Sequence, residues 1–319
     1  MTIISKDISK AISLLTNNAI VAIPTETVYG LAGNIYSENA IRKIFEVKKR
    51  PHFNPLIVHV DSLKKVEALV SEFPEKAKLL AEAFWPGSLT LILKKNSTVP
   101  DLVTAGKDTV AIRIPNHAVS LRLLKQLPFP LAAPSANPFG SISPTSATHV
   151  ENYFKDAIEM VLDGGNCKNG IESTIIGFEN NEPVLYRLGS ISIEEITKVI
   201  GEIKIKNKQE IAPNAPGMLE RHYAPSTKTF LVHDVASFIK NYPDKNIGVL
   251  VFSQEIVAPN IKNLVVLSKK KNLKEAASKL YQSLHDLDNL HLDMIVAETF
   301  PDVELGKSIN DRLERATKD

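Results

Sequence analysis

The sequence contains almost no cysteine, and this scarcity excludes two classes of small-protein architecture. Cys167 is the single cysteine among 319 residues, so the chain can form neither an internal disulfide framework nor a cysteine-rich zinc site. Long apolar runs are also absent, because none approaches the ~20 residues that a membrane-spanning helix needs. Residues 1–18 lack the features of a signal peptide and predict an amphipathic helix. We therefore expect a cytoplasmic protein with no membrane association.

The sequence has no excess of charge of either sign. Lysine and arginine number 38 against 36 for aspartate and glutamate, which gives a net charge of +2. This balance does not favour a protein that binds nucleic acid through bulk electrostatics. The run of three lysines at 269–271 predicts a solvated surface turn. The length permits two domains, and the composition, 44% hydrophobic and 23% charged, is typical of a globular protein.

Residues 5 to about 200 alternate between short β-type runs and helical patterns, which predicts an α/β domain. Strands are expected at 19–23, 56–60, 89–93, 109–114, 130–133, 158–162, 173–178 and 183–187. Residues 24–34 are expected to form a tight turn region after the first of these strands. The irregular spacing favours a mixed sheet over a regularly repeating barrel.

The pattern changes after residue 203. Pro213, Pro216 and Pro225 forbid a continuous helix, so residues 204–228 predict a linker. Strands expected at 229–232, 247–252, 263–267 and 294–297 then alternate with helices expected at 235–241, 273–287 and 304–316. This alternation predicts a small open parallel sheet. The predicted units are therefore a domain at 1–203, a linker at 204–228 and a second domain at 229–319.

Common nucleotide-binding and catalytic motifs are missing, so any nucleotide chemistry must use a different kind of binding site. The chain has no G-x-x-x-x-G-K-[ST], no G-x-G-x-x-G, no H-E-x-x-H and no G-x-S-x-G. One unusual segment is PTETVYGLAGN at 24–34, where hydroxyl groups and a carboxylate follow an apolar strand. Hydroxyls at such a position suit recognition of a small polar ligand, and a plain hydroxyl-rich strand edge is the alternative.

Two further segments favour anion binding. In KKRPHFNPLIVHV, residues 48–60, Lys48 and Arg50 lie beside prolines, and fixed cations of this kind suit phosphate oxygens. Surface cations that end a helix are the alternative. In AAPSANPFGSISPT, residues 132–145, serines and Asn137 lie on a proline-held loop that can bind an anion or an adenylate. An ordinary surface loop is the alternative there.

Nine segments of the chain occur in an order that is specific to one family. They are PTETVYGL, K-x-R-P with NPLIVHV, FWPGSLTLIL, VAIRIPNH, PSANPFGSISPT, DGG…ESTII, YRLGSI, APGMLERHYAP and INDRL. With them the chain resembles the Sua5/YrdC family, specifically the two-domain threonylcarbamoyl-AMP synthases. The resemblance implies a YrdC-like α/β domain with a twisted mixed sheet and a basic cavity, followed by a linker and a small Rossmann-like domain.

The resemblance also implies a reaction and its ligands. L-threonine, bicarbonate or CO2, and ATP would give threonylcarbamoyl-AMP, pyrophosphate and water, and Mg2+ would be held through the ATP phosphates with no protein ligand. The product would pass to a separate complex that transfers the threonylcarbamoyl group to adenosine 37 of tRNA, with at most a weak tRNA contact by this chain.

Site residues follow from the same resemblance. The implied threonine site comprises Thr27, His59, Arg113, Ala133 (through its backbone) and Ser173. The implied ATP site comprises Arg50, Asn54, Thr109, Ser135, Ser143, Arg187 and Tyr223. The implied catalytic set comprises Lys48, Arg50, Ser135 and Asn137. Because Tyr223 falls in the predicted linker, the linker is expected to cover the pocket as a lid.

One departure and three competing functions accompany this resemblance. Glu304 stands where the family pattern predicts glycine, a difference expected to affect the second domain and not the pocket. A hydrogenase-maturation carbamoyltransferase shares a related domain, but the zinc fingers of that class need more than one cysteine. A binding module for double-stranded RNA is the second competing function, and the near-neutral charge weighs against it. A paralogue that binds ATP without making product is the third, and the intact K-x-R and S-x-N residues weigh against it.

Overall fold

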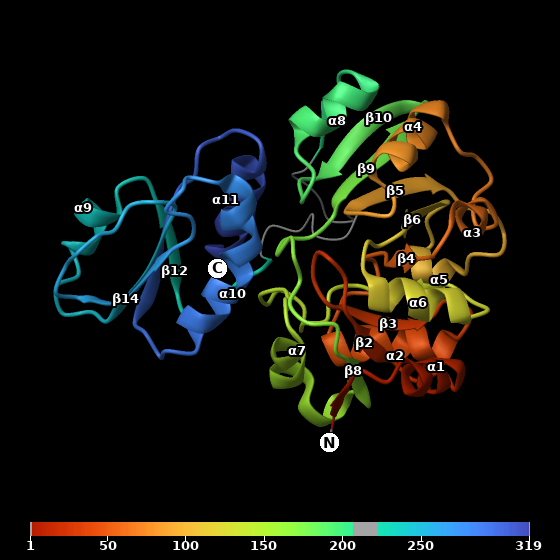
Figure 1. Ribbon diagram of the computed structural model, residues 1–319, viewed down its shortest axis with the longest axis horizontal. Helices are drawn as coiled ribbons and strands as arrows, with labels where there is room; N and C mark the ends of the chain where they lie inside the picture. The colour runs from red at the N-terminus through yellow and green to blue at the C-terminus, as the bar shows by residue number, and fades with distance from the viewer. Residues whose placement is uncertain (1, 207–221, 319) are drawn as a thin grey trace.

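The computed structural model describes residues 2–206 and 222–318, which form two parts, each built on its own sheet. Figure 1 shows the larger N-terminal part beside the smaller C-terminal part, with helices of the C-terminal part at the boundary. Most of the predicted linker, 204–228, lies outside the described residues. The path of the chain from one part to the other therefore stays a prediction.

The N-terminal part is an eleven-stranded mixed sheet with helices packed against it. Its strands are β1 (Ile3–Ser5), β2 (Val21–Ile23), β3 (Gly30–Asn34), β4 (Ile57–His59), β5 (Leu89–Lys94), β6 (Thr109–Arg113), β7 (Leu131–Ala132), β8 (Met160–Leu162), β9 (Thr174–Glu179), β10 (Glu182–Arg187) and β11 (Lys204–Ile205). Its helices are α1 (Ile8–Thr16), α2 (Glu38–Lys48), α3 (Leu63–Glu67), α4 (Glu75–Phe84), α5 (Asp101–Thr104), α6 (Ala118–Gln126), α7 (Ala147–Phe154), the 3-10 helix η1 (Lys155–Ala157) and α8 (Ile193–Ile200). The strand order is β1-β8-β2-β3-β7-β4-β6-β5-β9-β10-β11.

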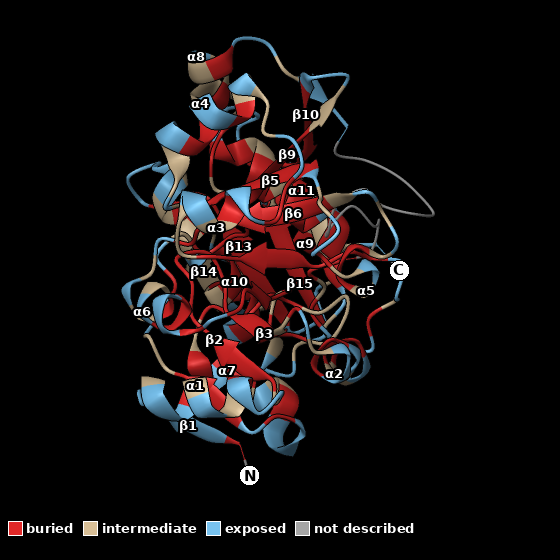
Figure 2. Cartoon of the chain, turned by 90° about the vertical axis from the view of Figure 1, so that its right-hand side faces the viewer, coloured by how far each residue is buried: buried red, intermediate tan, exposed pale blue. Residues whose placement is uncertain are grey.

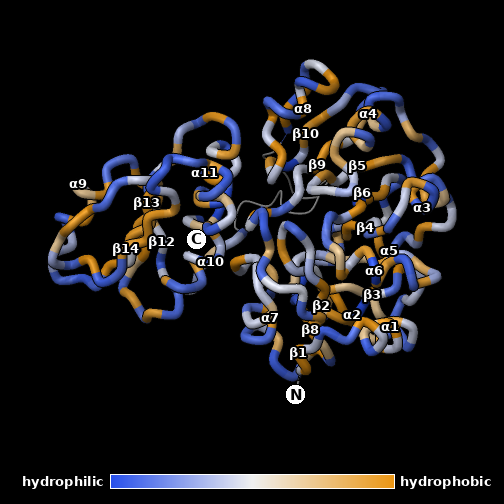
Figure 3. Tube along the Cα trace, in the orientation of Figure 1, coloured by the Kyte–Doolittle hydropathy of each residue, from blue (hydrophilic) through white to orange (hydrophobic). Residues whose placement is uncertain are grey.

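The predicted mixed sheet is confirmed, because parallel pairs such as β4 with β6 alternate with antiparallel pairs such as β5 with β6. The central strands are mostly apolar (Figure 3) and mostly buried (Figure 2), as expected for a sheet covered on both sides. Because these strands are packed in the core, the ends of β4 and β6 are held in place, and polar side chains lie at those ends.

Two N-terminal predictions were wrong. Residues 1–18 were expected to form one helix, but β1 pairs with β8 before α1 begins. Residues 24–34 were expected to be a turn, but 30–34 form β3, which pairs with β2 and β7. The run GLAGN lacks the β-branched residues typical of strands. Its glycines allow close packing instead, since a Cβ on Gly30 would meet the Ala133 Cβ at 3.1 Å.

The C-terminal part is a four-stranded parallel sheet, which confirms the predicted open parallel sheet. Its elements are β12 (Thr229–Val232), α9 (Val235–Ile239), β13 (Ile247–Val251), β14 (Ile261–Val266), α10 (Leu273–Asp288), β15 (Met294–Glu298) and α11 (Leu305–Ala316). The strand order is β12-β15-β13-β14. None of the helices in residues 2–206 and 222–318 has the length and apolar content to cross a membrane.

Helices α10 and α11 lie on the side of the C-terminal sheet that faces the N-terminal part (Figure 1). Their buried residues include charged and polar groups, among them Tyr281, Asp311, Arg312 and Arg315. The Ser308 hydroxyl donates to the carbonyl oxygen of Gly189 at 2.9 Å, so α11 is hydrogen-bonded directly to the N-terminal part. The C-terminal part is therefore docked at the edge where β9 begins and β10 ends.

Candidate active site

A pocket opens where several strands of the large sheet end. The space is about 530 Å³ including its opening to solvent, which is within the range of small-molecule sites. Its walls are formed by Thr25, Thr27, Val28, Gly30, Arg50, Ile57, His59, Arg113, Ala133, Pro134, Ser135, Glu172, Ser173, Arg187, His222 and Tyr223. Most of these residues come from separate segments that the sheet brings together.

The register of the sheet explains why His59 and Arg113 share this pocket. Strands β4 and β6 run parallel, and His59 is the register partner of Arg113 at their carboxyl ends. Both residues are buried. Burial, followed by the nearby charge of Arg113, lowers the pKa of His59 to about 3. His59 is therefore neutral near pH 7, and Arg113 supplies the positive charge at this end of the pocket.

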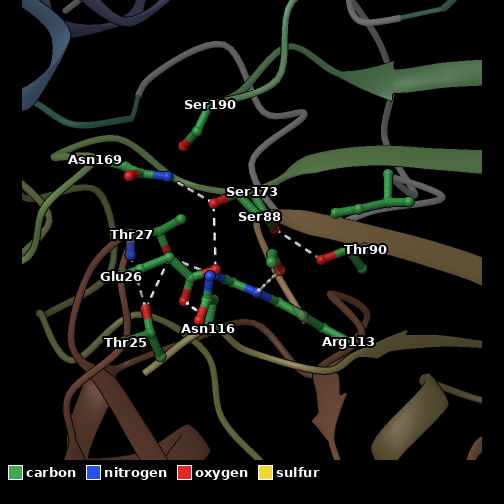
Figure 4. A network of polar contacts seen from close by, with 12 residues as sticks. Thr25, Glu26, Thr27, Ser88, Thr90, Arg113, Asn116, Asn169, Ser173 and Ser190 are labelled. Carbon is green, nitrogen blue, oxygen red and sulfur yellow. Dashed lines mark hydrogen bonds and ion pairs between the residues drawn. The ribbon is translucent and has the colours of Figure 1, made fainter. Parts of the chain in front are cut away.

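Arg113 is held on three sides (Figure 4). Its Nη2 lies 2.7 Å from Oε1 of Glu26, its Nη1 donates to Oγ1 of Thr27 at 2.9 Å, and its Nε donates to the carbonyl oxygen of Gly87 at 3.1 Å. Such a fixed guanidinium suits bidentate recognition of a carboxylate. Sequence reasoning identified Arg113 and Thr27 but missed Glu26.

Glu26 is itself buried and fully engaged. Its Oε1 accepts from the Ser88 hydroxyl at 3.2 Å, and its Oε2 accepts from the backbone N–H of Asn116 at 3.0 Å. The Asn169 side chain donates in turn to Ser88 Oγ at 2.7 Å. The position of this carboxylate, three residues after the apolar strand β2 and four before β3, was the available signal, because a buried acid needs a buried cation.

Ser173 and Arg187 form the neighbouring wall. The Arg187 Nη2 donates to the Ser173 hydroxyl at 3.0 Å and to the Ser173 carbonyl oxygen at 2.9 Å. The Ser173 hydroxyl also lies 2.7 Å from Oγ1 of Thr90. Arg187 is the last residue of β10, so antiparallel pairing with β9 places it against Ser173.

Lys48 is the last residue of α2, and Arg50 lies two residues beyond the end of this helix. The Lys48 Nζ donates to the carbonyl oxygen of Ser135 at 2.5 Å and to that of Asn137. Arg50 donates through Nε to the carbonyl oxygen of Asn54 at 3.2 Å. Burial first, and the charge of Arg50 second, holds the pKa of Lys48 well below its usual range. Lys48 therefore fixes the loop that carries Ser135, whereas Arg50 faces the pocket.

Glu172 links the pocket to the C-terminal part. Its Oε1 accepts from the Ser143 hydroxyl at 2.6 Å, and its Oε2 accepts from the Tyr281 hydroxyl and from Nε of Arg312, each at 2.9 Å. Burial acts to raise the pKa of Glu172, but the charges of Arg312 and Arg187 outweigh it and the pKa lies below its usual range. Glu172, Tyr281 and Arg312 were not singled out from the sequence.

The structure brings most of the predicted site residues to one place. Nine of them line the pocket: Thr27, Arg50, His59, Arg113, Ala133, Ser135, Ser173, Arg187 and Tyr223. Lys48, Asn54 and Asn137 belong to the 48–60 and 132–145 segments but do not line the pocket, and Ser143 contacts the pocket residue Glu172.

Thr109 is not among the pocket residues. It begins β6 and pairs with Lys94 of β5, about 13 Å along an extended strand from Arg113. It borders a separate surface depression with Glu72 and Phe178. Thr109 and Arg113 thus lie at opposite ends of the same strand, and the ATP contact of Thr109 that the resemblance implies stays a prediction.

Comparisons with known proteins agree with this geometry. Residues 13–189 match the Sua5, YciO and YrdC family described as "Telomere recombination", and residues 191–317 match the family described as "Threonylcarbamoyl-AMP synthase, C-terminal domain". The threonylcarbamoyl-AMP synthase of Pyrococcus abyssi is 41% identical over 96% of this chain and 93% of its own length. That of Bacillus subtilis is 40% identical over 97% of this chain and 92% of its own.

A solved structure is similar over both parts of the chain. The crystal structure of Pyrococcus abyssi Sua5 complexed with L-threonine superposes with a TM-score of 0.93 at 40% identity, and the match covers 99% of this chain and 98% of that one. The fold and these relatives together define a two-domain α/β enzyme of the nucleotidyltransferase class. The chain belongs to the Sua5 family of two-domain threonylcarbamoyl-AMP synthases.

Proposed function

We propose that this chain condenses L-threonine, bicarbonate and ATP into threonylcarbamoyl-AMP, with release of pyrophosphate and water, or uses CO2 in place of bicarbonate without forming water. The observation that supports this proposal is that one pocket contains both a set of groups suited to a carboxylate and a set suited to phosphates. Arg113 and its neighbours provide a place for an amino-acid carboxylate, and Arg50 with Arg187 provides a place for phosphates. The relatives that share this chain's length carry the name of the same activity.

The threonine end of the pocket is assigned to Thr27, His59, Arg113, Ala133 and Ser173. Arg113 pairs with the carboxylate of threonine, and neutral His59 avoids adding a second charge there. The backbone N–H of Ala133 already donates to the carbonyl oxygen of Ile57 at 2.9 Å. We therefore assign its carbonyl oxygen, not its N–H, to the bound amino acid.

The ATP end is assigned to Arg50, Asn54, Ser135, Ser143, Arg187 and Tyr223. Three buried polar atoms near this end have no protein partner among the described residues: Asn54 Nδ2, Asn54 Oδ1 and the Tyr223 hydroxyl. Buried polar groups without partners are rare in native proteins, so these atoms fit a polar ligand such as a nucleotide. Lys48 and Asn137 act here through the loop of residues 132–145.

The reaction needs two anions to approach each other. The amine of threonine bonds to carbon dioxide and loses a proton to form a carbamate; where bicarbonate supplies the carbon dioxide, its dehydration takes up that proton and releases the water. One carbamate oxygen then bonds to the α-phosphorus of ATP as the bond to pyrophosphate breaks. Arg50 and Arg187 offset the charge of the phosphates, and Arg113 offsets that of the threonine carboxylate. We therefore propose a basic pocket: Arg50, Arg113 and Arg187 line it, and the carboxylates Glu26 and Glu172 are each paired with an arginine.

Mg2+ is proposed to bind through ATP. Glu26 and Glu172 are the carboxylates beside the pocket, and each is already paired with an arginine. The described residues contain no group of three candidate ligands for a metal ion, which fits an ion held by phosphate oxygens and water. Held in this way, Mg2+ would supply positive charge to offset the charge on the leaving pyrophosphate.

The segment at 222–224 is proposed to close the pocket over the substrates. Tyr223 is buried, and the Ala224 N–H donates to the carbonyl oxygen of Gly140 at 2.8 Å. His222 and Tyr223 form part of the pocket wall. A closed pocket protects the carbamate and the adenylate from hydrolysis. Replacing Tyr223 with Ala is expected to increase ATP hydrolysis at the expense of product.

The experiment is pyrophosphate release from Mg-ATP, with L-threonine and bicarbonate each present or omitted. We expect release to require both, and to fall sharply in Arg50→Ala and in Lys48→Ala. Arg42→Ala is the matched control, because Arg42 lies on the same helix as Lys48 but is exposed and pairs with Glu38. Release that does not require threonine would contradict the proposal. Folded protein that releases none and binds double-stranded RNA would instead favour a binding module.

The product is proposed to pass to a separate complex that transfers the threonylcarbamoyl group to adenosine 37 of tRNA. An acyl-adenylate of this kind is reactive toward water, so a consumer must act soon after release. A salt-dependent shift of tRNA in a gel is the measurement for any direct contact by this chain, and we expect it to be weak because the net charge is only +2.

A further inference from the structure

The wall of the pocket contains one carboxylate whose partners come largely from the C-terminal part. Glu172 is 4% exposed and lies one residue before Ser173. Of its three side-chain donors, Ser143 belongs to the N-terminal part, whereas Tyr281 and Arg312 belong to α10 and α11. The two parts therefore meet at a pocket residue and not only at the outer surface.

All three guanidinium nitrogens of Arg312 form contacts at this junction. Besides the 2.9 Å contact from Nε to Glu172, its Nη2 donates to the carbonyl oxygen of Leu188 at 2.6 Å and its Nη1 to Oδ2 of Asp311 at 2.7 Å. Its Cζ also lies 5.0 Å from the centre of the Tyr223 ring, within the range of a cation–π contact. One side chain of the C-terminal part thus contacts two residues of the pocket wall.

The charge of Glu172 makes this contact important for an enzyme of anionic substrates. An unpaired carboxylate in the wall would repel the phosphates of ATP in a medium of low dielectric constant. Arg312 compensates that charge from behind the wall, and Tyr281 adds a hydrogen bond to the same oxygen. The arginines that line the pocket therefore do not have to neutralise Glu172 by themselves.

We propose that Arg312 and Tyr281 are positioning residues of the active site, through which the C-terminal domain holds Glu172 and Tyr223 in the arrangement that binds ATP. This inference rests on the proposed synthase function. It gives the C-terminal domain a defined part in the reaction, although neither residue lines the pocket.

A purely structural role for Arg312 makes a different prediction. The same interface has other contacts that Arg312 does not share, among them the Lys307–Glu194 ion pair at 2.8 Å and the stacked rings of His149 and His285 at 3.8 Å. These contacts remain when Arg312 is changed. If Arg312 only joins the two parts, its loss should resemble loss of Lys307.

The test compares Arg312→Met, Tyr281→Phe, the double variant Glu172→Gln with Arg312→Met, and the control Lys307→Ala. We measure ATP affinity by calorimetry and the pH dependence of kcat/KM for ATP by pyrophosphate release. Arg312→Met should weaken ATP binding and lower kcat/KM by roughly 10- to 100-fold, in line with loss of a charged hydrogen bond. Tyr281→Phe, which removes only one hydroxyl, should give a smaller loss, and Lys307→Ala should match the parent protein.

The pH profile distinguishes positioning from structure. Without Arg312, the buried Glu172 becomes harder to ionise, so the activity of Arg312→Met should recover as the pH falls and Glu172 becomes neutral. The double variant should regain most of the ATP affinity and should lack this pH dependence, because the amide that replaces the Glu172 carboxylate carries no charge. Circular dichroism checks the fold of each variant, and Tyr281→Phe carries the comparison if Arg312→Met does not fold.

Three results would overturn the proposal: ATP affinity in Arg312→Met and Tyr281→Phe equal to that of Lys307→Ala, an unchanged pH profile, or no rescue by Glu172→Gln. The outcome is separable from that of the proposed function. If the parent protein releases no threonine-dependent pyrophosphate, the synthase assignment fails, and the calorimetric comparison of ATP affinity still decides the role of Arg312 and Tyr281.

Discussion

Replacing Glu26 with Gln tests the reasoning about Arg113 most sharply. In the parent protein, the two Glu26 oxygens face three donors: the guanidinium of Arg113, the Ser88 hydroxyl and the Asn116 N–H. An amide has one acceptor oxygen and one donor NH2 group. Whichever way the new amide is oriented, its NH2 group faces either Arg113 or the Asn116 N–H, and two donors oppose each other.

The expected loss of stability follows from burial. The Arg113 and Glu26 side chains are only 4% and 6% exposed, so solvent cannot replace the lost contact. Removing one partner of a buried ion pair costs about 3–5 kcal/mol. For a domain of this size, that corresponds to a decrease in Tm of roughly 6–20 °C.

The expected effect on activity concerns threonine. Arg113 keeps its hydrogen bonds to Thr27 and Gly87 but loses the contact that orients Nη2. Because a misplacement of about 1 Å in a positioning group can cost up to 100-fold, we expect kcat/KM for threonine to fall by about 10- to 100-fold. The KM for ATP should change little, since Glu26 lies at the other end of the pocket.

The assays are thermal unfolding by circular dichroism and pyrophosphate release over a range of threonine concentrations. Glu182→Gln is the matched control, because Glu182 also pairs with a cation, Lys76, but on the exposed surface. It should leave both measurements unchanged. A Glu26→Gln variant with the Tm and threonine kinetics of the control would refute the view that Glu26 holds Arg113 in place.

Two other predictions concern stability. Glu304 has φ 45° and ψ −127°, a region that favours glycine, so Glu304→Gly should raise the free energy of unfolding by about 1 kcal/mol, measured by denaturant titration. His149 and His285 stack across the interface, and burial, the largest cause for each, lowers both pKa values to about 4. Because these pKa values lie below the ordinary 6.5, the unfolded chain binds more protons, and stability should decrease as the pH falls from about 6.5 to about 4. A His149→Phe variant should show a weaker pH dependence in denaturant titrations at pH 7 and pH 5, whereas an equal dependence would contradict the assignment.

Periodicity and turn residues predicted the parts of the fold whose strands are long and apolar. The runs at 89–93 and 247–252 became β5 and β13 with shifts of a residue or two. The same rules missed β3, because Gly30 and Gly33 form a strand through close packing and not through strand propensity. The local sequence does not show which distant segment packs against such a strand and stabilises it.

Family motifs predicted the residues that face the pocket better than those behind it. Arg113 and Ser173 lie in motifs and line the walls, whereas Thr109, which stands one residue before the motif of Arg113, lies at the far end of β6. Arg312 was missed although it falls in the INDRL segment, because its role depends on Glu172, 140 residues away in the sequence. A charged residue on the buried face of α11, in helical register with Ile309 and Ala316, was the available signal.

The most direct test of the account is identification of the product. Protein incubated with Mg-ATP, L-threonine and 13C-bicarbonate is quenched rapidly, and the nucleotides are resolved by mass spectrometry. We predict a threonine- and ATP-dependent species with the mass of threonylcarbamoyl-AMP, shifted by one mass unit relative to the reaction with unlabelled bicarbonate. AMP or ADP without any threonine-containing nucleotide, from folded protein at short reaction times, would contradict the central claim that this pocket joins all three substrates.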